Sequence, residues 1–491
     1  MMGTAGRRRR RSAAGGTLLA IVLLAACTVI HARLSGNRYV YEDLPAGGGF
    51  PVDENILIGY VDAQDVRAMR AHAWKLWGGL TAPSRSTWNG QDLPVFETWY
   101  SAIEVFEDRY RDRAPSRPRS FVRTLEVPKQ SLHTRSVAAI AGAGVMSFVK
   151  LNEPAATFVW DNGYYLKSTL DGLQQRSDAT NAPPEERRIK PFPRQAVALK
   201  LVYWLIKDGA SPHSQRGLTA LPYWDPAYPS PADGRSPMHL TWAKCVAVDP
   251  DGRYAKGARK TVDCNGTPAR PRLVESEVIG LDRFYTYRLR DQEEVAAARV
   301  FMQQLSHGAD EQERMVTGPG QIPDIGDHIA LMAMHVTTKE MDAWTFQTFW
   351  WSPTPDASLH AAGRPSEIRG VWANYLMCTA YSMVTPRTPS GGPHVCFNPY
   401  LESDLGPTTP FTVGTQRFPA DPMAGTRSNC MQCHARAGWP ALVPGNSSSA
   451  NLGRIANEGY MAPNDPYYAR ITKTDFLWSL VFHSQPPMPK P

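Results

Sequence analysis

The chain has 491 residues, of which 42% are hydrophobic and 20% charged, so its composition is that of a globular protein and excludes a disordered or collagen-like chain. This length accommodates two or three ordinary domains, or one large core with a smaller module. The formal charge of +7 includes the five arginines Arg7 to Arg11, and the chain from Cys27 onward carries about +2. The charge therefore gives no support to nucleic-acid binding.

The N-terminus has the pattern of an export signal. Its arginines precede an apolar stretch over 18–26, which is shorter than the roughly 20 residues that span a bilayer. The sequence Leu-Ala-Ala-Cys ending at Cys27 resembles the lipobox of bacterial lipoproteins, in which the cysteine is lipidated. We therefore expect residues 1–26 to be removed and Cys27 to anchor the protein on the periplasmic side of a membrane. The alternatives are cleavage elsewhere, for instance after Ala32, which would give a soluble periplasmic protein, and an uncleaved anchor.

After a linker over 27–50, hydrophobic spacing predicts a mixed body over 51–405. Helices are expected at Val61–Leu80, Val95–Tyr110 and Asp291–Leu305, the last with a capping box of Asp291 and Glu294. Strands are expected at Ala196–Ile206, Ile329–Val336, Trp344–Trp351 and Val371–Tyr381, and loop at 209–240. These elements predict an α+β fold class.

Four of the seven cysteines form two pairs of close sequence neighbours. The pairs are Cys245 with Cys264 and Cys378 with Cys396, 19 and 18 positions apart. An exported protein tends to oxidise such cysteines, so we expect two disulfides. Spacing alone does not fix the connectivity, and four buried free thiols are the alternative.

The segment with the most specific chemistry is Cys-Met-Gln-Cys-His, which places Cys430, Cys433 and His434 in the spacing C-x-x-C-H. Two thiols three positions apart on a helical turn can add to the two vinyl groups on one porphyrin edge. The histidine that follows then lies beneath the ring, as an axial ligand of the iron. A thioredoxin-like redox pair and half of a zinc site are the alternatives. The first lacks the expected βαβ setting, and the second lacks another Cys/His pair at finger spacing.

On these three residues the chain resembles the c-type cytochromes. The resemblance implies one covalent haem c, with its iron, in a small, mainly helical module over 406–491, where Asp475–Ser484 would be the C-terminal helix. More loosely, the chain resembles large bacterial single-haem cytochrome proteins of undefined role. The stretches that carry this wider likeness are Phe96–Tyr100, Met334–Val336, Asn398–Glu402 and Ser428–Met431.

The sequence leaves several candidates for the second axial ligand of the haem iron. Met461 lies 27 residues after His434, before the expected last helix, and is the first candidate. Met488 follows that helix in a Pro-Pro-Met-Pro sequence, and His335 and Met334 lie on an expected strand of the body. An open position, which belongs to ligand-binding or catalytic haems, is the remaining possibility.

Three functions fit these expectations. The first is electron transfer through the haem to an unspecified redox partner. The second is a haem-dependent oxidoreductase or peroxidase with a substrate pocket in the body, and the third is an envelope binding protein with an auxiliary haem. A single motif favours the first, because the cofactor supplies the chemistry. The size of the body favours the others. The sequence contains no other catalytic signature, such as G-x-S-x-G, H-E-x-x-H or a P-loop, and indicates no catalytic residues.

Overall fold

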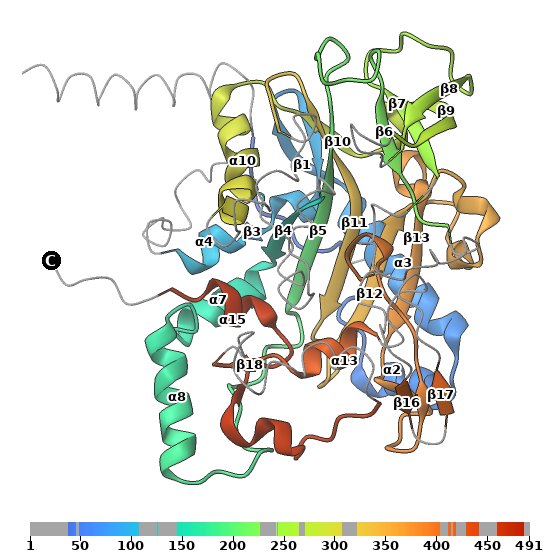
Figure 1. The fold of residues 1–491 in the computed structure, drawn as a ribbon. Helices are drawn as coiled ribbons and strands as arrows, with labels where there is room; N and C mark the ends of the chain where they lie inside the picture. Colours follow the sequence, from blue (N-terminus) through green and yellow to red (C-terminus); the bar gives the residue numbers. More distant parts are fainter. Residues whose placement is uncertain are drawn as a thin grey trace, which may run out of the picture.

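The computed structural model describes residues 38–45, 49–107, 125, 145–225, 242, 244–264, 271–306, 322–402, 411–413, 416–418, 429–440 and 459–485. The expected signal segment, Cys27 and Met488 lie outside these residues. The described part of the chain contains both helices and strands, with several sheets, which confirms the predicted α+β class (Figure 1). None of the described helices is long and apolar enough to cross a bilayer.

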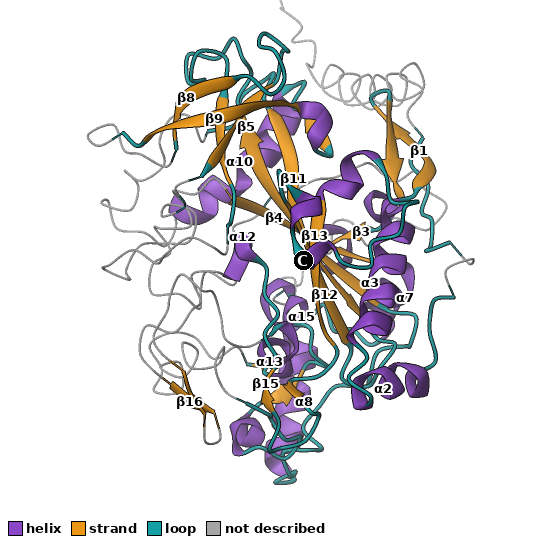
Figure 2. Cartoon of the chain, turned by 90° about the vertical axis from the view of Figure 1, so that its right-hand side faces the viewer, coloured by secondary structure: helices purple, strands orange, loops and turns teal. Residues whose placement is uncertain are grey.

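A seven-stranded sheet forms the centre of the molecule (Figures 1 and 2). Its order is β13-β12-β11-β5-β4-β3, and β10 pairs with the start of β11. All of these strand pairs are antiparallel. The strands are β3 (Tyr100–Ser101), β4 (Val145–Leu151), β5 (Val197–Ile206), β10 (Thr286–Arg288), β11 (His328–Thr338), β12 (Thr345–Trp351) and β13 (Tyr375–Ala380).

The central strands are apolar on both faces, as in a sheet covered on both sides. Every residue of β12 is buried, and so are nine of the ten residues of β5. The predicted strands that became β5, β11 and β12 are confirmed to within two residues at each end. The strand predicted over Val371–Tyr381 is shorter, because Gly370–Asn374 forms a 3-10 turn before β13.

Helix α3 (Val66–Thr81) covers one face of the sheet. The ring of Trp77 stacks on that of Phe349 of β12, with centroids 4.4 Å apart. The single helix predicted over Val61–Leu80 is wrong at its start, because α2 (Glu54–Asp62) ends there and Asp65 caps a new helix by accepting a hydrogen bond from the backbone of Ala68. Gly78 and Gly79 lie inside α3, so these two glycines do not end the helix.

The helix predicted over Val95–Tyr110 is wrong too. A 3-10 turn over Val95–Thr98 is followed by β3, and helix α4 (Ala102–Phe106) begins only after Ser101. Ser101 and Glu104 form a capping box, and Tyr100 and Ser101 pair with β4. Strand pairing and a strong cap therefore override the helical spacing of the aromatic residues.

A second sheet has the order β6-β7-β9-β8. It consists of β6 (Thr219–Pro222), β7 (Cys245–Asp249), β8 (Arg259–Asp263) and β9 (Leu273–Gly280), and the first of these lies in a range predicted as loop. The predicted helix after Asp291 is confirmed as α10 (Gln292–Ser306). Asp291 accepts a hydrogen bond from the backbone of Glu294.

The C-terminal segment packs against the body instead of standing apart from it. Side chains from α4, α7 (Glu153–Asp161), β12 and the segment after residue 429 share one hydrophobic cluster. The described part of 406–491 mixes short helices with short strand pairs. Its elements are β16 (Phe411–Val413), β17 (Gln416–Phe418), α13 (Cys430–Ala435), β18 (Gly438–Trp439), a 3-10 turn at Pro466–Arg470, β19 (Thr472–Lys473) and α15 (Trp478–His483).

The remaining described elements connect these layers. They are β1 (Pro83–Trp88), β2 (Gln91–Pro94), α8 (Lys167–Ala179), β14 (Val384–Thr385), β15 (Gly392–Pro393) and α12 (Pro399–Glu402). Helix α8 contacts the C-terminal segment, because Trp439 Nε1 donates a hydrogen bond of 2.8 Å to Asp171 Oδ1. The last of them, α12, brings a carboxylate next to the C-x-x-C-H segment, as described below.

Candidate functional site

Helix α13 carries the C-x-x-C-H motif. It begins after Asn429, whose Oδ1 accepts a hydrogen bond of 3.1 Å from the backbone of Gln432. Successive residues of a helix are rotated by about 100°, so Cys430, Cys433 and His434 share one face and Gln432 lies on the opposite one. We call the shared side the motif face of α13. All three residues predicted to hold haem lie on it.

The end of strand β13 fixes the start of α13. The backbone of Asn429 forms a β-bridge with Cys396, and Cys396 is joined by a disulfide to Cys378 of β13. The side-chain amide of Asn429 also lies within hydrogen-bond distance of three backbone carbonyls. These belong to Ser382 (3.1 Å), Met383 (3.1 Å) and His394 (2.8 Å). The motif is therefore attached directly to the central sheet.

Both predicted disulfides are confirmed. Cys245 pairs with Cys264 and Cys378 with Cys396, with sulfur–sulfur distances of 2.04 and 2.09 Å. Among the cysteines that the structure describes, Cys430 and Cys433 are the two free thiols. Burial raises the pKa of Cys433 to about 11 and that of Cys430 well above its usual range. Both thiols are therefore protonated at neutral pH.

The imidazole of His434 is held in one orientation. Its Nδ1 lies 2.7 Å from the carbonyl oxygen of Phe476, and its ring packs against Phe346 of β12 with centroids 4.8 Å apart. A carbonyl can only accept, so Nδ1 carries the proton and Nε2 keeps its lone pair. Burial lowers the pKa of His434 to about 4, so the ring is neutral at pH 7. A neutral histidine fixed through Nδ1 is the usual form of a metal-binding histidine.

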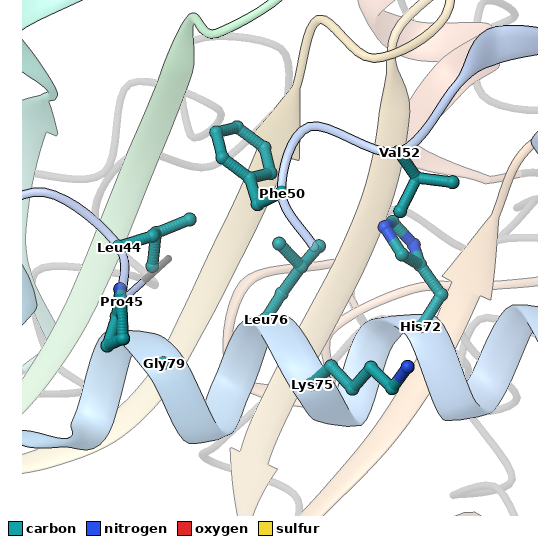
Figure 3. Close-up of a pocket in the computed structure, with 8 residues that line it drawn as sticks. All are labelled: Leu44, Pro45, Phe50, Val52, His72, Lys75, Leu76 and Gly79. Atoms are coloured by element: carbon teal, nitrogen blue, oxygen red, sulfur yellow. The ribbon is translucent and has the colours of Figure 1, made fainter. Parts of the chain in front are cut away.

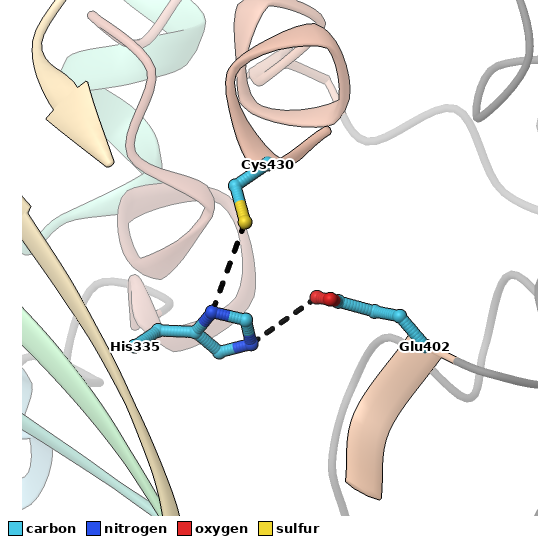
Figure 4. A group of neighbouring side chains, drawn as sticks. All are labelled: His335, Glu402 and Cys430. Carbon is cyan, nitrogen blue, oxygen red and sulfur yellow. Dashed lines mark hydrogen bonds and ion pairs between the residues drawn. The ribbon is translucent and has the colours of Figure 1, made fainter. Parts of the chain in front are cut away.

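A second histidine lies on the same side of α13. Nδ1 of His335, on β11, is 3.9 Å from Cys430 Sγ, and its Nε2 is 3.1 Å from Glu402 Oε1. Figure 4 shows the imidazole between the thiol and the carboxylate, which comes from α12. The ligand atoms of these three side chains all lie within 4.8 Å of one another. The group combines nitrogen, oxygen and sulfur donors and could hold a metal ion.

The carboxylate of Glu402 is fixed in place. It accepts a hydrogen bond of 2.6 Å from the backbone of Asn398. Burial by itself would raise the pKa of Glu402, but the charge and hydrogen bond of His335 and the bond from Asn398 lower it below its usual value. Glu402 is therefore an ionised acceptor at neutral pH.

The central sheet retains solvent access along one row of paired positions on this side. Val149, Lys200, His335, Thr348 and Cys378 are successive register partners across β4, β5, β11, β12 and β13. All of them except Thr348 are half-buried, whereas nearly every other residue of these five strands is buried. We call these five residues the open row. The row faces α13, because His335 belongs to it and contacts Cys430.

The structure separates the candidates for the second axial ligand. Met334 is fully buried and, being adjacent to His335 on a strand, points to the opposite face, where it pairs with Phe349 on the α3 side. Met461 is buried in the hydrophobic cluster of the C-terminal segment. Its neighbourhood is tied to α13 by Gln432 Nε2, which donates a hydrogen bond of 2.9 Å to the carbonyl of Gly459.

A separate polar cluster lies on the far side of the sheet, under α3. His72 Nδ1 is 2.5 Å from the hydroxyl of Tyr381, and its Nε2 is 3.2 Å from Glu340 Oε1. All three side chains are buried. His72 also borders a small pocket with apolar walls beside α3 (Figure 3), lined by Leu44, Pro45, Phe50, Val52, His72, Lys75, Leu76 and Gly79. The cluster connects α3 to the ends of β11 and β13 and is explained by that structural role.

The residues at the motif face fit a covalent haem. The thiols are unoxidised in a chain whose other described cysteines form disulfides, and His434 presents a neutral Nε2. The open row supplies an accessible surface opposite the motif. Sequence reasoning did not identify Glu402, Phe346 or Lys200 as members of this site. Lys200 could have been identified from the sequence, because it is the one charged residue within an otherwise apolar strand.

No protein-family model matches the chain, and neither a curated protein nor a solved structure matches it. The site must therefore be interpreted from its own geometry and chemistry.

Proposed function

We propose that this protein is an exported c-type cytochrome that carries one haem c on Cys430 and Cys433 and transfers electrons through it. The observation that carries the proposal is the composition of the motif face of α13. Two free thiols lie there, three positions apart, beside a histidine whose Nδ1 is fixed by the carbonyl of Phe476. This is the donor set that covalent haem attachment needs.

The bound haem would supply reversible one-electron chemistry at its iron. The chain's own residues would hold and orient it. Cys430 and Cys433 would attach it, and His434 would bind the iron through Nε2. Phe476 and Phe346 keep the imidazole of His434 in one orientation, which prevents the ligand from rotating.

The large body gains a role in this proposal. We propose that 406–491 is the haem-binding, cytochrome c-like segment and that the central sheet forms the opposite wall of its site. The open row supports this, because it is the half-buried part of the sheet and includes one cation, Lys200. A cation at this wall suits a cofactor that carries carboxylates.

The proposed cellular location rests on the oxidised cysteines and on the expected export signal at the N-terminus. Disulfides persist in oxidising compartments, and two are present in the described residues. Together with the expected signal over 1–26, they support export to the periplasmic side of a membrane, with Cys27 as the lipid anchor. The electron partner would then be another protein of the cell envelope.

The test is covalent haem content. The full chain is expressed in a bacterial host with the periplasmic haem-attachment machinery and separated on a denaturing gel, which removes any haem that is not covalently bound. We expect the band to stain for haem. In Cys430→Ala and Cys433→Ser the stain should be lost or strongly reduced.

The matched control is the double variant Cys245→Ser/Cys264→Ser. It also removes two sulfurs, but from a disulfide in the second sheet, and should keep the haem stain. A wild-type band without haem from such a host would overturn the proposal.

A further inference from the structure

We propose that His335 is the second axial ligand of the haem iron, opposite His434, and that Glu402 holds its ring in the ligating orientation. This inference rests on the proposed function, because it needs the haem that Cys430 and Cys433 would carry. It assigns the distal ligand to the central sheet of the body, outside the C-terminal segment.

The first argument is the side of α13 on which each candidate lies. A haem attached to Cys430 and Cys433 must lie on the motif face, so a second ligand must reach it from beyond that face. His335 meets this condition, because its Nδ1 is 3.9 Å from Cys430 Sγ. Gly459, two residues before Met461, is instead bound to Gln432 on the opposite face of the helix.

The second argument is the rigidity of the element that carries His335. The residue lies inside β11, which is paired on both sides, with Lys200 of β5 and Thr348 of β12 as its register partners. A ligand on a central strand is held in place more firmly than one on a loop. Met461 precedes a turn in which the backbone of Asp465 bonds to Ala462, outside any described helix or strand.

The third argument is the chemistry of the ring. Glu402 Oε1 lies 3.1 Å from Nε2 of His335, and the carboxylate is itself held by the backbone of Asn398. A carboxylate that accepts from one ring nitrogen fixes the tautomer and makes the other nitrogen a stronger donor to a metal. In this arrangement the other nitrogen is Nδ1, which faces the motif (Figure 4).

The fourth argument is the surroundings. The side chain of His335 keeps 14% of its accessible surface within a strand whose other inner residues are buried. A histidine that served packing alone would be expected to be enclosed like its neighbours. The exposed part of His335 lies on the open row, which faces α13. A haem on the motif face of α13 would therefore contact His335 from this side.

The assignment predicts a haem with two histidine ligands. Such a haem has a lower reduction potential than one with histidine and methionine, and it keeps six ligands in both oxidation states. That behaviour suits electron transfer and disfavours reaction of the iron with peroxide or oxygen.

The test is optical and paramagnetic resonance spectroscopy of the purified holoprotein, together with carbon monoxide binding to its ferrous form. We expect a low-spin wild type without the weak ferric band in the red that marks a methionine ligand, and without rapid carbon monoxide binding. His335→Ala should become high-spin and bind carbon monoxide at once, and added imidazole should restore the low-spin spectrum. Met461→Ala, the matched control, should keep the wild-type spectrum.

Glu402→Gln keeps the size of the side chain and tests orientation without removing the ligand. It should raise the apparent affinity for carbon monoxide by about 10- to 100-fold, the range typical of losing a carboxylate that supports a ligating histidine. A methionine band that disappears in Met461→Ala, or a low-spin spectrum that survives His335→Ala, would overturn the inference. Haem staining on the denaturing gel reports the proposed function separately, since covalent attachment does not depend on the second ligand.

Discussion

Asn429 and Cys396 pair their backbones in a β-bridge, and this contact joins the C-x-x-C-H motif to the central sheet. Cys396 is bonded to Cys378 in β13, so one disulfide and one β-bridge connect the central sheet to Asn429, the N-cap of α13. The two predicted disulfides therefore have different consequences. One stabilises the second sheet, and the other positions the motif.

We predict that Cys378→Ser/Cys396→Ser reduces haem attachment, whereas Cys245→Ser/Cys264→Ser does not. Each disulfide closes a loop of similar length, so each loss should cost about 3 kcal/mol of unfolding free energy. Haem content is measured as haem absorbance per mole of folded protein. A difference between the two variants then reports how the disulfide positions the motif, because both variants lose a similar amount of stability. Equal haem content in the two variants would show that the disulfide between Cys378 and Cys396 does not matter for attachment.

Asn429 should be sensitive for a related reason. Replacing it with alanine removes the cap of α13 and the amide contacts with the carbonyls after β13. A lost helix cap costs about 1 kcal/mol. Asn429→Ala should lower haem incorporation and the midpoint of thermal unfolding. Asn429→Ser keeps a cap oxygen without placing a charge among these carbonyls, and it should recover part of both. Identical behaviour of the two variants would assign the whole effect to the amide.

The sequence predicted the central strands well because a buried strand needs a continuous apolar run, as in β5 and β12. It predicted the helices near the N-terminus poorly. There the ends of the helices depend on the cap at Asp65 and on the pairing of Ser101 with β4. The spacing of hydrophobic residues gives no information about either.

The candidate site divides in the same way. Cys430, Cys433 and His434 are adjacent in sequence, so their spacing alone indicates their chemistry. His335, Glu402 and Lys200 come together only through strand register and the position of α12. Such long-range pairing cannot be inferred from one chain without knowledge of the sheet order. The sequence alone therefore ranks Met461 first, because it follows the motif along the chain and precedes the expected last helix.

The proposed N-terminal lipid anchor can be tested directly, although Cys27 lies outside the described residues. Labelled palmitate should enter the wild-type protein and not Cys27→Ala, because Cys27 is the proposed acylation site. The variant should also leave the membrane fraction. An unlabelled soluble protein that begins near Arg33 would instead establish ordinary signal cleavage.

The buried cluster under α3 should matter for stability and not for the haem. In Tyr381→Phe, the Nδ1 of His72 loses its partner at 2.5 Å, and an unsatisfied buried polar group costs about 1–3 kcal/mol. We expect a lower midpoint in urea with an unchanged haem spectrum. Tyr60→Phe is the control, because Tyr60 packs against the same hydrophobic cluster and its hydroxyl has no hydrogen bond among the described residues. A changed haem spectrum in Tyr381→Phe would place this cluster in the electron-transfer site.

Lys200 should tune the reduction potential. Its charge acts on both Cys433 and His434, and it is the register partner of His335. A nearby cation disfavours the ferric state, which carries one more positive charge than the ferrous state, so Lys200→Gln should lower the potential by some tens of millivolts. Redox titration followed by the haem absorbance measures this shift, and it should shrink only slightly at high salt because Lys200 is half-buried. Lys75→Gln removes the same charge from an exposed position of α3, on the other face of the sheet, and should leave the potential unchanged. Equal shifts in both variants would mean that the haem does not lie against the open row.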